Sequence, residues 1–118
     1  MNTPSALVIG AGVGGMKAAL ELAESGIWTY LLDRSAYLGG EISQLERQFP
    51  TNRCGMCQML PTYDRDHASK YCLRKDLSHP LLTLIPQAEV ENVEGSAGNF
   101  RVEVRLTSRL IKEERCTG

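Results

Sequence analysis

The sequence has no excess of basic residues, no block of like charges and no long apolar run. Its 118 residues include 13 Lys and Arg and 14 Asp and Glu, so the formal net charge is −1 and nucleic-acid binding is not expected. A transmembrane helix needs roughly 20 consecutive apolar residues, which the chain lacks. The amino terminus also lacks the basic region and apolar stretch of a secretion signal. These absences predict one small cytoplasmic domain that contacts neither nucleic acid nor membrane.

The chain also lacks the residue patterns of a hydrolase. No Ser/His/Asp arrangement or pair of carboxylates suggests general acid–base or nucleophilic chemistry, so no catalytic residue is assigned. Cysteines are few, four in all. In a cytoplasmic protein they are expected to be metal ligands or redox groups rather than structural disulfides.

What the sequence does have is an apolar stretch, residues 6–9, followed at once by a glycine-rich turn. Gly10, Gly12 and Gly15 occupy the three glycine positions of a dinucleotide-binding turn. The first permits a tight bend, the second lets the backbone approach a pyrophosphate, and the third lets the next helix lie close to the strand. Gly14, in the same turn, is counted with them among the cofactor-binding residues.

The residues after this turn predict a helix and a second strand. Four apolar residues recur at helical spacing on one face: Met16, Ala19, Leu20 and Ala23. Gly26 stands where a helix commonly ends, and residues 28–32 predict the second strand. Asp33 ends that strand, close to the expected distance of about 20 residues beyond the glycines, where its carboxylate can accept hydrogen bonds from ribose hydroxyls. The free N–H groups at the start of the helix would then face the phosphates.

An acid with a basic neighbour and then a glycine pair resembles flavoproteins that bind FAD through a Rossmann-type half. These residues are Asp33, Arg34, Gly39 and Gly40. Arg34 has a competing interpretation as a contact for the 2′-phosphate of NADP. That interpretation ranks lower, because Asp33 would repel the phosphate.

The rest of the chain predicts a short helix, a long connection, a third strand and a hairpin. The expected ranges are a helix over 41–47 with Ile42 and Leu45 on one side, a helix from about 62 to 79, a parallel strand over 81–85, and a β-hairpin of 88–94 and 99–106. Residues 49–80 would form a crossover lengthened by a cysteine-containing insertion. The fold class is therefore α/β, a partial Rossmann-type parallel sheet with a β-hairpin and this insertion.

Three cysteines in the insertion form a candidate metal site. Cys54, Cys57 and Cys72 have the spacing C-x₂-C-x₁₄-C. Soft thiolate ligands select iron–sulfur centres or zinc. A fourth ligand is not evident, although His67 or His79 could complete a zinc site. A redox dithiol or unpaired thiols are the remaining alternatives.

Several motifs together resemble one family. They are the glycine turn, Leu38-Gly39-Gly40, Phe49-Pro50-Thr51 with Cys54-x-x-Cys57, Cys72-Leu73-Arg74-Lys75, His79-Pro80 and Gly98-Asn99-Phe100. Over almost its whole length the chain resembles the N-terminal part of the flavin-binding A subunit of heterodisulfide reductases and related bacterial proteins. The resemblance implies a two-dinucleotide-binding flavoprotein fold, FAD, iron–sulfur clusters such as [4Fe–4S], and electron transfer between partner subunits. It also favours a cluster over zinc at the three cysteines.

The family resemblance also suggests how the chain is divided. Residues 1–106 are expected to be a partial FAD-binding domain, with 49–80 as its insertion. In the family, a sequence like Cys116-Thr117-Gly118 continues into a cysteine-rich ferredoxin segment, so 107–118 would be the truncated start of such a segment. A fragment of this kind is expected to be inactive alone. Two other functions stay open: a fragment of an NAD(P)-dependent dehydrogenase, and a non-catalytic, metal-stabilised assembly module.

Overall fold

A computed structural model of the chain describes residues 3–45, 47, 49–50, 77–108 and 111–117. Its elements are β1 (Ser5–Ile9), α1 (Val13–Glu24), β2 (Trp28–Leu32), the 3₁₀ helix η1 (Gly40–Gln44), β3 (Leu82–Ile85), β4 (Ala88–Ser96), β5 (Asn99–Leu106) and the 3₁₀ helix η2 (Glu113–Arg115). Most of the predicted insertion, with the helix expected from residue 62 and Cys54, Cys57 and Cys72, lies outside the described residues.

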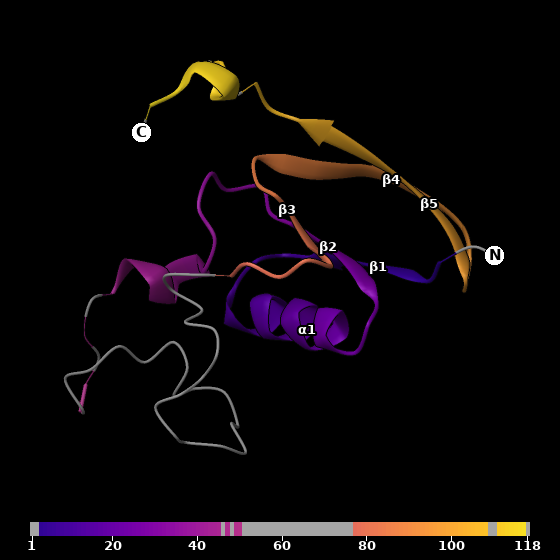
Figure 1. Ribbon diagram of the computed structural model, residues 1–118, viewed down its shortest axis with the longest axis horizontal. Coiled ribbons are helices and arrows are strands. Elements are labelled where there is room, and N and C mark those ends of the chain that lie inside the picture. The colour runs from indigo at the N-terminus through magenta and orange to yellow at the C-terminus, as the bar shows by residue number, and fades with distance from the viewer. Residues whose placement is uncertain (1–2, 46, 48, 51–76, 109–110, 118) are drawn as a thin grey trace.

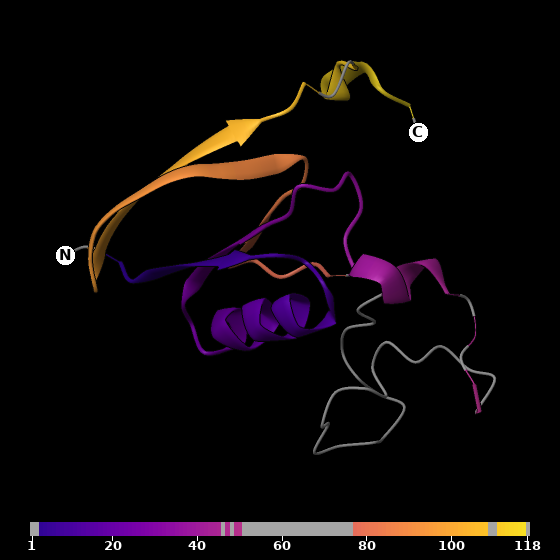
Figure 2. The same ribbon diagram turned by 180° about the vertical axis from the view of Figure 1, so that it is seen from behind.

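The first three strands form one parallel sheet in the order β1-β2-β3. Val8 pairs with Leu31, and Leu31 pairs with Leu84, so the three strands run side by side in register. Helix α1 lies on one side of this sheet and the β4–β5 hairpin extends over the other side, as both views show (Figures 1 and 2). The predicted α/β class with a parallel sheet and a hairpin is confirmed.

Helix α1 packs on the sheet through the four residues that its spacing predicts. Its buried residues are Met16, Ala19, Leu20 and Ala23. The helix also ends at the predicted place: Gly26 has a φ of +85°, and the N–H of Ile27 donates to the Leu22 carbonyl at 3.0 Å. This is a Schellman ending, in which a glycine in the left-handed region lets the chain satisfy the last helical carbonyls.

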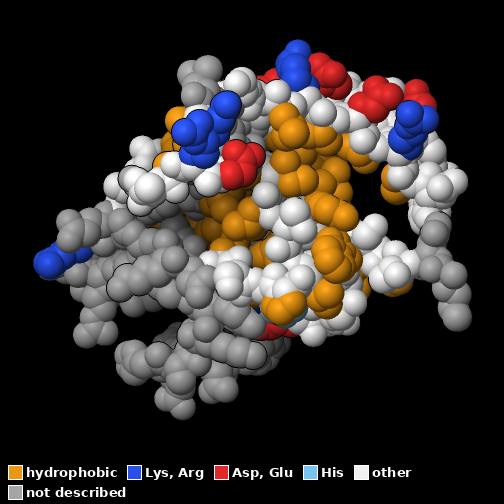
Figure 3. Space-filling view, turned by 45° about the horizontal axis from the view of Figure 1, so that its top comes forward, with side chains coloured by type: hydrophobic (Ala, Val, Ile, Leu, Met, Phe, Trp, Pro, Cys, Tyr) orange, Lys and Arg blue, Asp and Glu red, His pale blue; other side chains and the backbone are white. Residues whose placement is uncertain are grey.

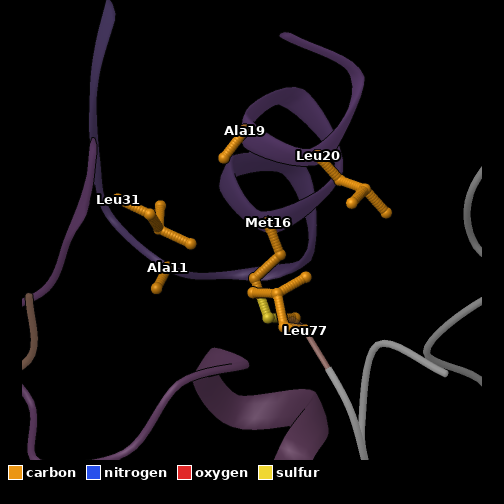
Figure 4. Packing of buried hydrophobic residues seen from close by; sticks show 6 residues of the cluster. All are labelled: Ala11, Met16, Ala19, Leu20, Leu31 and Leu77. Carbon is orange, nitrogen blue, oxygen red and sulfur yellow. The ribbon is translucent and has the colours of Figure 1, made fainter. Parts of the chain in front are cut away.

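The core lies between α1 and the sheet. Its cluster of buried residues is Ala11, Met16, Ala19, Leu20, Leu31 and Leu77 (Figure 4). Leu77 stands just before β3 in the chain and packs beside Met16. The core therefore fixes the glycine turn, through buried Ala11, against the helix that follows it.

The face of the sheet opposite α1 is partly exposed to solvent. Ile9 is 60% exposed, Trp28 41% and Tyr30 37%. Figure 3 shows hydrophobic side chains gathered in the middle of this side of the molecule, with charged residues along its upper border. Thr29 and Leu31 of β2 are buried whereas Trp28 and Tyr30 are partly exposed, so this part of β2 alternates like a strand that is fully covered on one side only.

The hairpin matches its predicted pattern. Val90 pairs with Val104, and the pairing continues to Ser96 and Asn99, so the connecting turn is shorter than the four residues expected. A β-bulge between Val90 and Asn92 interrupts the register. The bulge is the reason that the apolar alternation of β4 shifts by one residue along its length.

The short helix after Gly39 differs from its prediction. It is a 3₁₀ helix over Gly40–Gln44 rather than a helix over 41–47. Ile42 packs against the core as expected, whereas Leu45 is extended and 51% exposed. No helix in the described part of the chain is long and apolar enough to cross a membrane.

Candidate nucleotide-binding site

The glycine turn joins the end of β1 to the start of α1. Gly10 has a φ of +100°, in the region that glycine adopts freely, and its N–H donates to the Leu32 carbonyl at 2.7 Å. Gly12 is the N-cap of α1, and among the residues that the structure describes no side chain caps this helix end. The first N–H groups of a helix have no partner within the helix, and together with its dipole they favour an anion at this end.

The glycines of the turn differ in what surrounds them. A Cβ on Gly15 would collide with the Gly10 carbonyl oxygen, so only glycine lets α1 lie this close to the end of β1. A Cβ on Gly12 or Gly14 would meet no atom of the described residues within 4 Å. The close packing predicted for Gly15 and the open approach predicted for Gly12 are both present in this geometry.

Asp33 lies directly against the turn. Its Oδ2 accepts a hydrogen bond from the Ala11 N–H at 2.7 Å, and its Oδ1 accepts one from the Ser35 N–H at 2.7 Å. A carboxylate offers about four acceptor positions, so further hydroxyl donors can still bind both oxygens. Asp33 therefore joins the end of β2 to the glycine turn while keeping acceptor capacity for a ribose.

The charge of Asp33 is stabilised by the same contacts. Desolvation by partial burial raises the pKa of Asp33, but hydrogen bonds from the Ala11 and Ser35 amides, together with the Arg34 charge, outweigh it. The pKa of this carboxyl therefore lies below its ordinary value. Asp33 is an anion at neutral pH and disfavours a phosphate at its own position.

The glycine pair packs on the turn as well. The Gly39 N–H donates to the Ala11 carbonyl at 2.6 Å. A Cβ on Gly40 would come within 3.4 Å of the Gly12 Cα, and both glycines of the pair have positive φ, +105° and +60°. The structure thus brings together three segments that are separate in sequence: the turn, Asp33 and Gly39–Gly40.

No contact between the Arg34 side chain and the turn is seen within the described part of the chain. The Arg34 side chain is exposed, and its predicted contact with a cofactor stays a prediction. Cys54, Cys57 and Cys72 fall outside the described residues; within the described part, no group of three or more His, Cys, Asp or Glu could hold a metal ion. Cys116 is an exposed free thiol. His79 Nδ1 accepts the Leu81 N–H at 3.1 Å, so this nitrogen is not available to a metal in this conformation.

Two groups that shape the site belong to the backbone, so the residue types in the sequence do not reveal them directly. They are the backbone amides of Ala11 and Ser35, which hold the Asp33 carboxylate. The amide of Ser35 could have been found, because an Asp that binds the N–H two residues on is a common turn. The amide of Ala11 could not, because it depends on the pairing of β1 with β2.

A parallel βαβ unit with a glycine turn and an acid after its second strand defines a Rossmann-type nucleotide-binding domain. The comparison with known families agrees. Residues 8–72, more than half of the chain, match the family described as "NAD(P)-binding Rossmann-like domain", and the chain belongs to it.

More specific relatives belong to heterodisulfide reductases, which confirms the resemblance drawn from the motifs. The chain is 37% identical to a protein of Archaeoglobus profundus that resembles the A subunit of heterodisulfide reductase, over 98% of this chain and 15% of that protein. It is 40% identical to the A subunit of the H(2):CoB-CoM heterodisulfide,ferredoxin reductase of Methanothermobacter marburgensis, over 96% of this chain and 16% of that one. The chain thus spans about 15% of the length of these relatives.

A solved structure supports the fold independently. The L-proline dehydrogenase from P. horikoshii superposes with a TM-score of 0.59, at 19% sequence identity, over 87% of this chain and 19% of that one. At this identity the likeness concerns the fold alone. The α/β arrangement is thus shared with a chain of distant sequence.

Proposed function

We propose that the chain binds FAD through residues 10–15, as the nucleotide-binding part of a protein related to the A subunit of heterodisulfide reductases. The observation that carries this proposal is the open space at Gly12, which lies at the uncapped N-terminus of α1. A pyrophosphate at this point would meet backbone N–H groups and the positive end of the helix dipole.

The other residues of the cluster fit the remaining parts of such a ligand. Asp33 would accept hydrogen bonds from the adenosine ribose, and Gly39–Gly40 would leave the cofactor room beside the turn. When bound, FAD supplies the redox chemistry, while this chain's residues bind and orient it. Asp33 also disfavours NADP, because its anionic carboxylate would repel a 2′-phosphate.

The wider function is proposed from the relatives. Their names identify them with subunits of reductases, and we propose that this chain too works with partner subunits in electron transfer. Residues 1–106 would form the nucleotide-binding domain, and 107–118 would begin an adjoining ferredoxin-like segment. A cytoplasmic location belongs to the same proposal, because thiolate ligands at Cys54, Cys57 and Cys72 need a reducing compartment.

The alternative cofactor is a nicotinamide dinucleotide, which the matched family name favours. The two are separated by titrating the full chain with FAD, ADP, NADH and NADPH by calorimetry. We expect FAD and ADP to bind and NADPH to bind least. Preference for NADH over FAD would replace the flavin proposal, and failure of all four ligands would refute the nucleotide site.

Asp33→Asn tests the ribose contact. An asparagine keeps one acceptor oxygen but turns its NH₂ toward either the Ala11 or the Ser35 amide, so one backbone donor loses its partner. We expect ADP and FAD binding to weaken by about 1–3 kcal/mol, the scale of hydrogen bonds to a charged group. Unchanged calorimetric affinity would remove Asp33 from the site.

The same substitution has a consequence for acid stability. Because the folded-state pKa of Asp33 is lowered from 3.8, its contribution to stability is present above that pH and is lost as the pH falls through the lower folded value. Asp33→Asn removes this contribution. We therefore expect urea unfolding of the variant to depend less steeply on pH below about 4 than that of the wild type.

We further propose that Cys54, Cys57 and Cys72 hold an iron–sulfur cluster, with zinc as the alternative. Anaerobic reconstitution with iron and sulfide should then give broad visible absorption. Cys54→Ser should abolish it, because a hydroxyl is a poor substitute for a soft thiolate. Cys116→Ser is the matched control and should keep the cluster. Loss of the cluster in that control, or a zinc-only site after purification, would overturn the assignment.

A further inference from the structure

The connection from β3 to β4 contains an unusual backbone conformation beside the candidate site. Among the described residues, Gln87 is the one residue other than glycine with a positive φ, +54°. It follows Pro86, at the bend between β3 and β4. Glycine or asparagine normally adopts a positive φ, because most other side chains are strained in this conformation.

This conformation directs neighbouring amides toward the segment that carries Asp33. The Gln87 N–H donates to the Ser35 carbonyl at 3.0 Å, and the Ala88 N–H donates to the Asp33 carbonyl at 2.9 Å. In return, the Asp33 N–H donates to the Ile85 carbonyl at 3.1 Å. The main chain on both sides of the Asp33 side chain is therefore held by the segment from Ile85 to Ala88.

The same residue also holds the end of the hairpin. The Thr107 N–H donates to the Gln87 carbonyl at 2.8 Å. A strained residue persists only where its surroundings hold it in several ways, and such residues concentrate at functional sites. Gln87 is held in this way, because its N–H and its carbonyl both form hydrogen bonds with other segments of the described chain.

We propose that Gln87 is a positioning residue for the nucleotide site. Its left-handed backbone fixes residues 33–35, so that the Asp33 carboxylate meets the Ala11 amide and faces the ribose position. This inference rests on the proposed nucleotide binding. It assigns the effect to the backbone conformation of Gln87 and not to the chemistry of its side chain.

The test compares two substitutions at this position in the full chain, with ADP as the calorimetric probe. Gln87→Gly permits the left-handed conformation without strain, so ADP affinity should equal or exceed that of the wild type. Gln87→Val disfavours this conformation strongly, and ADP should bind roughly tenfold more weakly. Circular dichroism establishes that each variant is folded at the temperature of the titration. Gln87→Ala replaces the valine variant if that variant does not fold.

A second readout separates positioning from a general loss of stability. The pKa of Asp33, followed by its carboxyl NMR signal, should rise toward the ordinary value in Gln87→Val and stay low in Gln87→Gly. A valine variant that melts earlier but keeps both its ADP affinity and the low Asp33 pKa would overturn the proposal. If ADP does not bind the wild-type chain, the proposed function fails instead, and the Asp33 pKa still tests the role of Gln87.

Discussion

Gly15→Ala is expected to destabilise the chain severely and to abolish nucleotide binding with it. The added Cβ would collide with the Gly10 carbonyl oxygen and lie 3.0 Å from the Gly10 carbonyl carbon. Both atoms belong to the backbone, so no side-chain rotation can relieve the contact. Either α1 must move away from β1 or the turn must open. The first movement would separate buried Met16 from Leu31 in the core.

The expected loss of stability is about 3 kcal/mol or more, at the upper end of what forced overpacking costs. Urea denaturation followed by circular dichroism measures it. Gly14→Ala is the matched control, since it adds the same methyl one residue away, where no described residue has an atom within 4 Å. Alanine is the better helix former by about 1 kcal/mol, so the control should be neutral or slightly stabilised. Equal destabilisation by the two changes would contradict the close packing of Gly15 on Gly10.

The contrast between these two glycines shows what could be predicted from sequence. The spacing of Gly10, Gly12 and Gly15 identified the turn, and the spacing of the apolar residues identified the buried face of α1. Both are local patterns, because a helix repeats its contacts every three or four residues. The same spacing assigned the close packing to Gly15, but it did not predict whether a side chain at position 14 would have room.

Features that depend on contacts between distant segments could not be predicted from the sequence. The Ala11 amide reaches Asp33 only because β1 and β2 are paired. The spacing of Leu45 predicts that it shares a side with Ile42, but η1 ends before Leu45 and leaves it extended and exposed. The positive φ of Gln87 could not be predicted from the sequence, because glutamine is not a residue that favours this conformation.

Gly12→Val should separate binding from folding, which Gly15→Ala does not. Gly12 has a φ of −69° and a ψ of −179°, an extended conformation that valine adopts readily. A Cβ there meets no atom within 4 Å in the described part of the chain. Valine is a poorer N-cap residue than glycine, so the free energy of unfolding should fall by no more than about 1 kcal/mol.

Binding, in contrast, should be lost, because the branched side chain would fill the space through which the pyrophosphate approaches the backbone at the start of α1. We expect the affinity for ADP and FAD to fall by at least roughly a hundredfold, or about 2.8 kcal/mol. Gly12→Ala, with a single added methyl, should give a smaller loss in the same direction. Calorimetric titration at a temperature where thermal melts show all three proteins folded makes the comparison. A valine variant that binds ADP as tightly as the wild type would place the phosphates elsewhere on the molecule.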